Sequence, residues 1–140
     1  VHGLPGSGKS EVIHLMRQMF VEVFGWEHGR EFICLAQMNT MASLIGGFTV
    51  HSFWEIGIVS DSRQKKSTQN RTKPDINTLF VKAKNLRWII VDEISMISAH
   101  LLGQLEHIVF EVVRKMNRYK LRPDKTARPF GGINTLLFGD

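Results

Sequence analysis

The stretch HGLPGSGKSE, residues 2–11, places three glycines, a proline and two serines directly before a segment with helical apolar periodicity. Residues 3–10 fit the pattern G-x-x-x-x-G-K-[ST] at every fixed position. Glycines free the backbone so that successive N–H groups can converge on one phosphate, and the following helix adds its positive amino end. Average residue usage gives a chance match in such a chain a probability on the order of 0.5%. The stretch therefore predicts a phosphate-binding loop.

The loop supplies the predicted contacts to a nucleoside triphosphate and its metal ion. Lys9 carries a mobile positive charge for the β- and γ-phosphates, and we expect it to take part in catalysis. The hydroxyl of Ser10 is a hard oxygen that suits Mg²⁺. The predicted nucleotide-binding residues are Gly3, Gly6, Ser7, Gly8, Lys9 and Ser10.

A pair of carboxylates follows the apolar run RWIIVD, residues 87–92, which is the clearest strand in the chain. Asp92 and Glu93 would stand at its carboxyl end, where ligands bind in open α/β sheets. We expect Asp92 to hold Mg²⁺ through water and Glu93 to polarise the water that attacks the γ-phosphorus. Many strands end in Asp-Glu, but together with a phosphate-binding loop the pair predicts a hydrolytic site.

Helical and extended patterns alternate along the rest of the chain. Apolar spacing by threes and fours predicts helices over 9–24, 76–86 and 97–116. Short apolar runs predict buried strands over 31–36, 87–92 and 133–138. The first helix should bury one stripe and end at Gly25: Val12, Ile13, Met16, Met19, Phe20, Val23 and Phe24. In the last helix, Ser98 is the expected N-cap and Glu111–Lys115 an outer i,i+4 pair. The alternation predicts an α/β fold, a three-layer parallel sheet with helices on both faces.

Charge and cysteine content narrow the class of protein. The 140 residues carry a net charge of +5, and segments 61–73 and 118–128 each contribute +4. These basic loops are either solvated surface or a path for a polyanion. No apolar run approaches the ~20 residues of a membrane span, so we expect no membrane partner. Cys34 is the only cysteine, which rules out an internal disulfide, and its apolar neighbours predict a buried side chain.

Four stretches in this order resemble the PIF (petite integration frequency) DNA helicases of superfamily one, including those of Helitron-type transposons. They are GLPGSGKS, IGGFTVHSF, IIVDEISMIS and RPFGGINTLLFGD. The resemblance implies a P-loop NTPase with a RecA-like lobe and an ATP-driven motor that moves 5′ to 3′ on single-stranded DNA. It also implies Mg²⁺, DNA forks as partners, and work in DNA repair, recombination and telomere maintenance, in the nucleus or mitochondrion if the source is eukaryotic.

The resemblance also points to a DNA-facing segment. Gln37-Met38-Asn39 stands where the family usually has Pro-Thr-Gly, and Met41 replaces its first alanine. Nearby aromatic rings could either pack in the core or stack on bases: Phe48, Phe53 and Trp54. The candidate DNA-binding residues are Gly46, Gly47, Thr49, His51 and Ser52. His100 and His107 fall on the solvated face of one helix, and we expect no zinc.

We expect residues 1–140 to be part of an N-terminal RecA-like ATPase lobe that is truncated at both ends. The chain starts inside the strand that should lead into the loop, and Gly139-Asp140 would begin the next family motif. A missing second lobe would supply the arginine fingers, so we predict nucleotide binding with little turnover and no unwinding. Two alternatives stay open: a phosphate-loop enzyme that does not act on DNA, such as a small-molecule kinase or AAA-type ATPase, and a non-catalytic transposon-derived remnant that binds nucleic acid.

Overall fold

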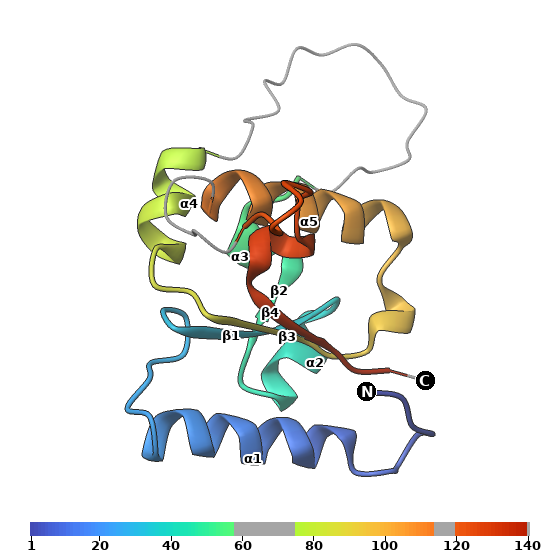
Figure 1. Ribbon diagram of the computed structural model, residues 1–140. Coiled ribbons are helices and arrows are strands. Elements are labelled where there is room, and N and C mark those ends of the chain that lie inside the picture. The colour runs from blue at the N-terminus through green and yellow to red at the C-terminus, as the bar shows by residue number, and fades with distance from the viewer. Residues whose placement is uncertain (58–74, 114–119, 140) are drawn as a thin grey trace, which may run out of the picture.

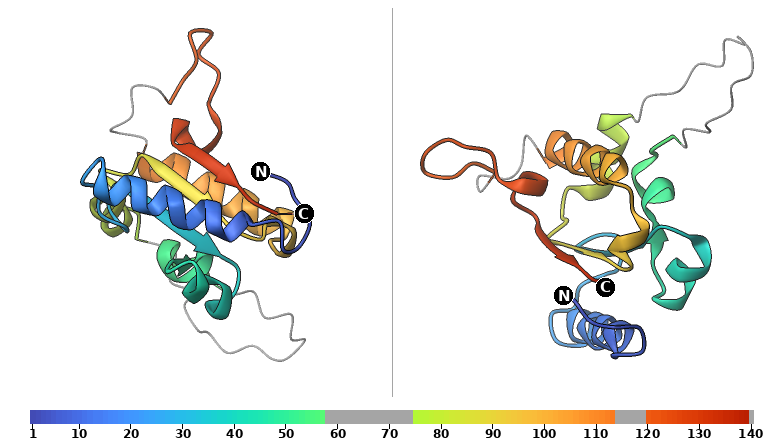
Figure 2. Two further views of the ribbon diagram at one scale, coloured as in Figure 1. Left: turned by 90° about the horizontal axis from the view of Figure 1, so that it is seen from below. Right: turned by 90° about the vertical axis from the view of Figure 1, so that its right-hand side faces the viewer.

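The computed structural model describes residues 1–57, 75–113 and 120–139. A parallel sheet of four strands in the order β2-β1-β3-β4 forms the middle layer. Helices α1 and α2 cover one face, and α3, α4 and α5 cover the other (Figures 1 and 2). The predicted α/β fold with a parallel sheet and helices on both faces is therefore confirmed.

The strands are β1 (Phe32–Ala36), β2 (Phe48–Thr49), β3 (Trp88–Val91) and β4 (Asn134–Leu137). Strand β1 is buried along its whole length and β3 along all but its first residue, which explains their continuous apolar sequences. Phe32 lies opposite Trp88, which in turn lies opposite Asn134. The three predicted strands are confirmed to within a residue or two at each end, whereas β2 was not predicted.

The helices are α1 (Lys9–Glu22), α2 (Asn39–Leu44), α3 (Val50–Trp54), α4 (Ile76–Ala83) and α5 (Ala99–Val112), with 3-10 turns η1 (Ile94–Met96) and η3 (Pro129–Gly132). Ser98 caps α5 as predicted, because its hydroxyl accepts a hydrogen bond from the Leu101 amide at 3.2 Å. The helices predicted over 9–24 and 76–86 end earlier than expected, whereas residues 114–116 of the third lie outside the described residues. Lys115 of the predicted Glu111–Lys115 pair lies outside the described residues.

Two hydrophobic cores hold the layers together, one on each face of the sheet. Phe53 and Trp54 are fully buried in the core under α3, α4 and α5. Ile13 and Phe20 anchor α1 to the other face. Full burial of side chains of this size stabilises the fold by about 1.5–3 kcal/mol each. Phe53 and Trp54 therefore pack in the core. Of the two alternatives that the sequence left open for these rings, core packing or stacking on bases, the structure shows the first.

The apolar stripe of α1 is narrower than predicted. Ile13 and Phe20 are buried, but Val12, Met19 and Val23 are 43%, 41% and 71% exposed. The last three follow one another at intervals of seven and four, so they form a second stripe beside the buried one. The prediction that all seven apolar residues share one buried stripe was wrong. A helix that packs on a sheet buries only a narrow face, and here that face holds Ile13 and Phe20.

Cys34 is buried in β1, as predicted. Burial is the main cause that raises the pKa of its thiol to about 12, with a smaller contribution from the negative charge of Asp92 and an opposing one from Arg17. A thiol with this pKa carries almost no thiolate at neutral pH, so Cys34 acts as a core side chain.

His28 is a half-buried imidazole whose charge is coupled to the fold. Its Nε2 accepts a hydrogen bond from the Cys34 amide at 3.1 Å, and its ring stacks on Phe48 with centroids 5.1 Å apart. Burial, aided by the positive charge of Arg17, lowers the pKa of His28 to about 4. Only the neutral imidazole can accept the bond from the Cys34 amide.

This coupling predicts that the fold loses stability as the pH falls from 6.5 to 4. In that window the unfolded chain protonates His28 and the native state does not, so the free energy of unfolding should fall as pH falls. Urea unfolding of the wild type and of His28→Gln at several pH values measures the effect. The variant, which cannot titrate there, should show a flatter pH dependence. Equal slopes for the two proteins would contradict the assignment.

No described helix combines the length and the apolar character that crossing a membrane requires.

Candidate nucleotide site

The predicted phosphate-binding loop lies at the carboxyl edge of the sheet, beside the end of β4. His2 forms a parallel bridge with Gly139, and the Gly3 amide donates to the Gly139 carbonyl at 3.2 Å. The Gly139 amide in turn donates to the Val1 carbonyl at 3.1 Å. Residues 1–3 therefore continue the sheet next to β4, and the loop starts where parallel strands present ligands.

Backbone geometry explains the glycines of this loop. Gly6 has a φ of 79° and Gly8 a φ of 83°, a left-handed region that costs other residues about 1–2 kcal/mol. A Cβ on Gly3 would lie 2.6 Å from the Ser7 hydroxyl, so the Ser7 side chain would have to turn aside to admit one. Gly8 directly precedes α1, so the loop leads into the positive end of a 14-residue helix.

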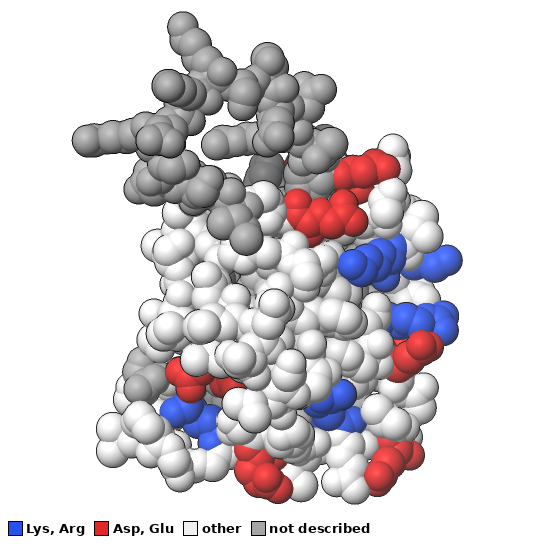
Figure 3. Space-filling view, turned by 180° about the vertical axis from the view of Figure 1, so that it is seen from behind, with Lys and Arg blue, Asp and Glu red and all other residues white. Residues whose placement is uncertain are grey.

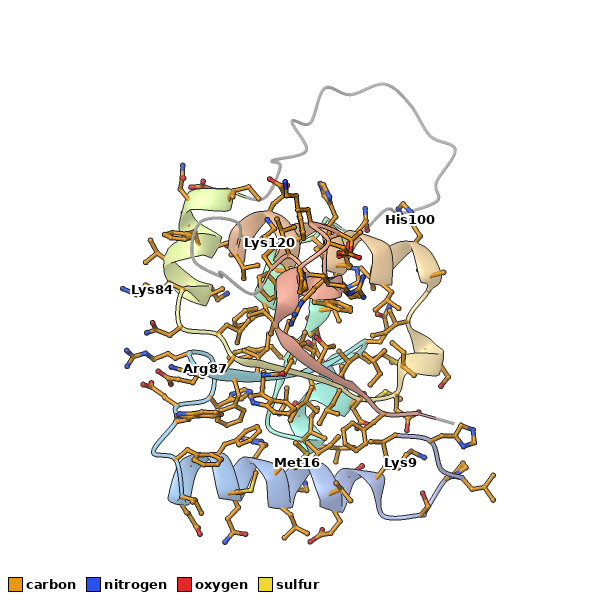
Figure 4. The ribbon with its side chains drawn as sticks, in the orientation of Figure 1. Lys9, Met16, Lys84, Arg87, His100 and Lys120 are labelled. Carbon is orange, nitrogen blue, oxygen red and sulfur yellow. The ribbon has the colours of Figure 1, made fainter. Side chains whose placement is uncertain are left out.

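The Lys9 side chain folds back over the loop. Its Nζ donates hydrogen bonds to the carbonyls of Gly3 at 2.5 Å and Leu4 at 3.2 Å, and the residue is only 8% exposed. Figure 4 shows it between the amino end of α1 and the sheet. An ammonium held this way is already placed inside the loop, where an incoming phosphate would replace the carbonyl oxygens. Ser10 is exposed one residue further along α1.

Asp92 is a buried carboxylate without a cationic partner. It follows β3 directly, its amide donates to the Leu35 carbonyl at 2.8 Å, and the residue is 5% exposed. Its Oδ1 accepts a hydrogen bond from the Glu93 amide at 3.0 Å. Within residues 1–57, 75–113 and 120–139, no Lys or Arg forms an ion pair with it. Because a buried carboxylate is costly without a counter-charge, Asp92 fits a site for a bound cation.

The described residues contain no group of three or more His, Cys, Asp or Glu side chains that could hold a metal alone. Mg²⁺ needs no such cage, since it commonly binds one or two protein oxygens together with waters and phosphates. The Ser10 hydroxyl and the Asp92 carboxylate are the two protein oxygens that would fit it. His100 and His107 are exposed on α5, as predicted.

Glu93 adopts a strained backbone conformation beside Asp92, with φ 50° and ψ 55°. The Ile94 amide holds the turn by donating to the Phe138 carbonyl at 2.8 Å. Gly139 packs against it so closely that a Cβ there would lie 2.7 Å from the Ile94 Cγ2. A glutamate in this region costs about 1–2 kcal/mol, and such strain clusters at functional sites. Nothing in the residue pattern predicted this strain.

The strain predicts an unusual stability order. Glu93→Gly and Glu93→Ala both remove the carboxylate, but glycine tolerates φ 50°, so Glu93→Gly should be the more stable variant by about 1 kcal/mol. Urea unfolding of the two variants measures the difference. Glu11 in α1 is the matched control, because there Gly should be less stable than Ala by about 1 kcal/mol. If Glu93→Gly were no more stable than Glu93→Ala, the strain would be refuted.

Most of the candidate DNA-binding residues have clear structural tasks. Gly46 has a φ of 58° and touches the Arg17 guanidinium, while a Cβ on Gly47 would collide with the Cys34 carbonyl. Thr49 is the N-cap of α3, because its Oγ1 accepts from the Ser52 amide at 3.1 Å. The Thr49 hydroxyl also donates to the Ser52 hydroxyl at 2.8 Å. These contacts account for the four residues without DNA, whose binding there stays a prediction.

Two rings of the same segment remain accessible. Phe48 is 39% exposed, although one of its faces stacks on His28, and His51 is half-buried on α3. Unlike Phe53 and Trp54, Phe48 therefore combines core contacts with an accessible edge. A DNA contact by His51 also stays a prediction.

The structure describes only part of the two basic loops. Segment 61–73 and residues 118–119 lie outside the described residues. Residues 121–127 form an exposed turn closed by a bridge between Leu121 and Ala127. Lys120 differs from the prediction of a solvated basic loop, because it is 8% exposed and donates to the Phe110 carbonyl at 2.8 Å. The Lys120 ammonium therefore binds a backbone carbonyl of the fold instead of facing solvent.

Two residues at this side of the sheet were missed by the sequence analysis. The Gln37 Oε1 atom, just after β1, is buried with no hydrogen-bond partner among the described residues. Arg17 of α1 donates a hydrogen bond to the Ile45 carbonyl. The departure of residues 37–39 from the family pattern could have drawn attention to Gln37, whereas nothing in the sequence links Arg17 to Ile45.

A family model and individual relatives both match this chain over nearly its whole length. A family model described as "PIF1-like helicase" matches residues 1–140. ATP-dependent DNA helicase PIF1 of Saccharomyces cerevisiae (strain YJM789) is 34% identical over 142 residues, which cover 99% of this chain and 14% of that protein. ATP-dependent DNA helicase Pif1 of Bdellovibrio bacteriovorus is 32% identical over 138 residues, which cover 99% of this chain and 27% of that protein.

A crystal structure of Pif1 helicase from Candida albicans has the same fold, with a TM-score of 0.71 and 28% identity. The match covers 99% of this chain and 28% of that one. The chain thus spans less than a third of the length of these relatives. The resemblance found in the four sequence stretches is confirmed, and the chain belongs to the PIF1-like helicase family.

Proposed function

We propose that this chain forms the nucleotide-binding lobe of an ATP-dependent DNA helicase. The observation that carries the proposal is the meeting, at one edge of the sheet, of a glycine loop holding Lys9 and a buried, unpaired Asp92. A loop that only turned the chain would need neither a buried lysine nor a nearby buried carboxylate. Family membership favours a helicase over a small-molecule kinase, an AAA-type ATPase or a non-catalytic remnant.

Each residue of the site has a proposed role. The amides of residues 6–9 and the amino end of α1 bind phosphate oxygens, and Lys9 moves from the loop carbonyls to the β- and γ-phosphates. Ser10 and Asp92 would hold Mg²⁺, which would offset the negative charge of the phosphates. Glu93 orients a water molecule and accepts its proton on the carboxylate.

The DNA part of the proposal rests on the relatives, which are named ATP-dependent DNA helicases. We infer that the whole protein moves 5′ to 3′ along single-stranded DNA and opens forks during repair, recombination or telomere maintenance. Its place would be the nucleus or mitochondrion of a eukaryotic source. A second RecA-like lobe would complete the ATP site, with residues 1–140 as part of the first.

Lys9→Ala is the direct test of the nucleotide site in this chain. Loss of a charge-assisted contact worth about 1.5–3 kcal/mol should weaken binding of a nonhydrolysable ATP analogue about 10- to 150-fold in the presence of Mg²⁺. Titration calorimetry measures the affinity. Lys125→Ala, which removes an exposed lysine from the turn at 121–127, is the matched control and should leave the affinity unchanged. Equal affinities of wild type and Lys9→Ala would refute the site.

A further inference from the structure

A pocket of about 410 Å³ lies at the edge of the sheet opposite to the phosphate-binding loop. It is lined by the residues that lead into β3 and β4, by the ends of α4 and α5, and by Trp26. In Figure 4, Lys84 and Arg87 mark this side of the molecule and Lys9 marks the other. The pocket shares no residue with the candidate nucleotide site.

Aromatic rings form much of the pocket wall. Trp26, Phe80 and Trp88 line it, and the floor includes the aliphatic side chains of Leu86 and Val112. The two indoles are half-buried and fixed from behind by Phe20, whose ring centroid lies 5.2 Å from that of Trp26 and 5.7 Å from that of Trp88. Because both indoles pack on Phe20, these two planar rings are held in place at the pocket wall.

A further planar group belongs to the same wall. The Arg87 guanidinium lies 5.8 Å from the ring centroid of Trp26. The backbone of Arg87 is held in place, because its amide donates to the Glu31 carbonyl at 2.7 Å and its carbonyl accepts from the Asn134 side chain at 3.1 Å. The guanidinium thus lies over one face of the Trp26 indole, and both kinds of planar group are surfaces on which nucleic-acid bases stack.

The pocket rim is positively charged. Lys84 and Arg87 are exposed, no carboxylate is among the described residues that line the pocket, and neither side chain forms an ion pair with any described residue. The nearby Glu31 carboxylate accepts a hydrogen bond from the Glu27 amide instead. Figure 3 shows Lys and Arg side chains on the edge of the molecule that carries α4, with Asp and Glu side chains above and below them. The pocket thus fits a ligand that joins a flat apolar group to negative charge.

We propose that this pocket binds a nucleotide unit of a single-stranded nucleic acid. The base contacts the indoles of Trp26 and Trp88, and the adjoining phosphates contact Lys84 and Arg87. A space of about 410 Å³ is large enough for one base with its sugar. The inference goes beyond the proposed function, because it places a strand at the edge of the lobe remote from the ATP site.

Tryptophan fluorescence tests the proposal on the chain itself. Trp26 and Trp88 line the pocket, whereas Trp54, the third tryptophan, is fully buried elsewhere. The tetranucleotide (dT)₄ should quench the emission in a saturable way. Lys84→Gln combined with Arg87→Gln should weaken this binding at least tenfold. Because each phosphate contact to a single strand contributes about 0.7, the slope of log affinity against log salt should become shallower by about 1.4.

The matched control, Arg122→Gln combined with Lys125→Gln, removes two exposed charges that do not line the pocket and should leave the quenching unchanged. No quenching in the wild type, or equal weakening in the control, would overturn the proposal. Thymidine 5′-monophosphate binding as tightly as (dT)₄ would assign the pocket to free nucleotides instead of a strand. Quenching by the tetrapeptide Asp-Asp-Asp-Phe but not by (dT)₄ would identify an acidic-peptide site and also overturn it.

Lys9→Ala separates this proposal from the proposed function. The variant should lose affinity for the ATP analogue and keep full quenching by (dT)₄. Intact quenching with no ATP binding in the wild type would refute the nucleotide site alone. ATP binding without quenching would refute the pocket alone.

Discussion

Joining a second RecA-like lobe to this chain should raise its ATP turnover about 10³- to 10⁵-fold. This is the range that an arginine finger contributes to phosphoryl transfer, and the resemblance to superfamily-one helicases places that arginine on the second lobe. The chain alone carries the loop, Asp92 and Glu93, so it should bind ATP but release phosphate very slowly. Phosphate release at saturating ATP and Mg²⁺, with and without single-stranded DNA, measures the ratio.

The two-lobe protein also provides the control. Replacing its arginine finger by alanine should return turnover to the level of the isolated chain while leaving ATP affinity largely intact. If the 140-residue chain alone showed vigorous, DNA-stimulated hydrolysis, a second lobe would be unnecessary and the proposed division of roles would be wrong.

Glu93→Gln in the two-lobe protein should reduce ATP turnover about 10²- to 10⁴-fold. Glutamine keeps the size and hydrogen-bonding reach of the side chain but cannot accept the proton of the attacking water, and general bases contribute rate factors in this range. The affinity for a nonhydrolysable ATP analogue should stay within about threefold, because a general base makes no contact that holds the ground state. Single-turnover hydrolysis and equilibrium binding together measure both effects.

Glu55→Gln is a closely matched control. Glu55 has a left-handed backbone like that of Glu93, with φ 54°, but it follows α3 and is exposed. Its replacement should leave turnover unchanged. An equal loss of turnover in both variants would mean that the effect comes from the fold, and undiminished turnover in Glu93→Gln would assign the base to another residue.

The strands and the site edge could be predicted because their physical causes are local. The runs that became β1 and β3 are apolar throughout, as central strands covered on both faces must be. Parallel pairing then places the end of β3, and with it Asp92, at the same edge as the loop. The apolar pattern of the strands and their parallel pairing were therefore enough to predict which edge of the sheet carries the site.

Other features depend on contacts that sequence periodicity does not encode. Val12 and Ile13 are equally apolar, and only the position of α1 on the sheet decides that Ile13 is buried. Strand β2 has two residues and exists through its pairing with Leu35 and Ala36. Lys120 is buried because the fold places the Phe110 carbonyl within reach of its ammonium.

Within the segment predicted to face DNA, a local signal was missed by the sequence analysis. Thr49 and Ser52 are three residues apart before a helix, a spacing at which an N-cap hydroxyl accepts from the backbone of the first turn. That pattern favours a helix cap before any ligand is invoked. The pocket at the opposite edge had no such signal, because Trp26, Lys84 and Asn134 come from distant parts of the chain.

The most direct test is a crystal structure of the chain with a nonhydrolysable ATP analogue and Mg²⁺. The triphosphate should lie against the amides of residues 6–9, with the Lys9 Nζ moved from the Gly3 and Leu4 carbonyls onto phosphate oxygens. The magnesium ion should sit between Ser10 and Asp92. A nucleotide bound elsewhere, or an Asp92 carboxylate turned away from the metal, would contradict the assignment of this edge as the ATP site.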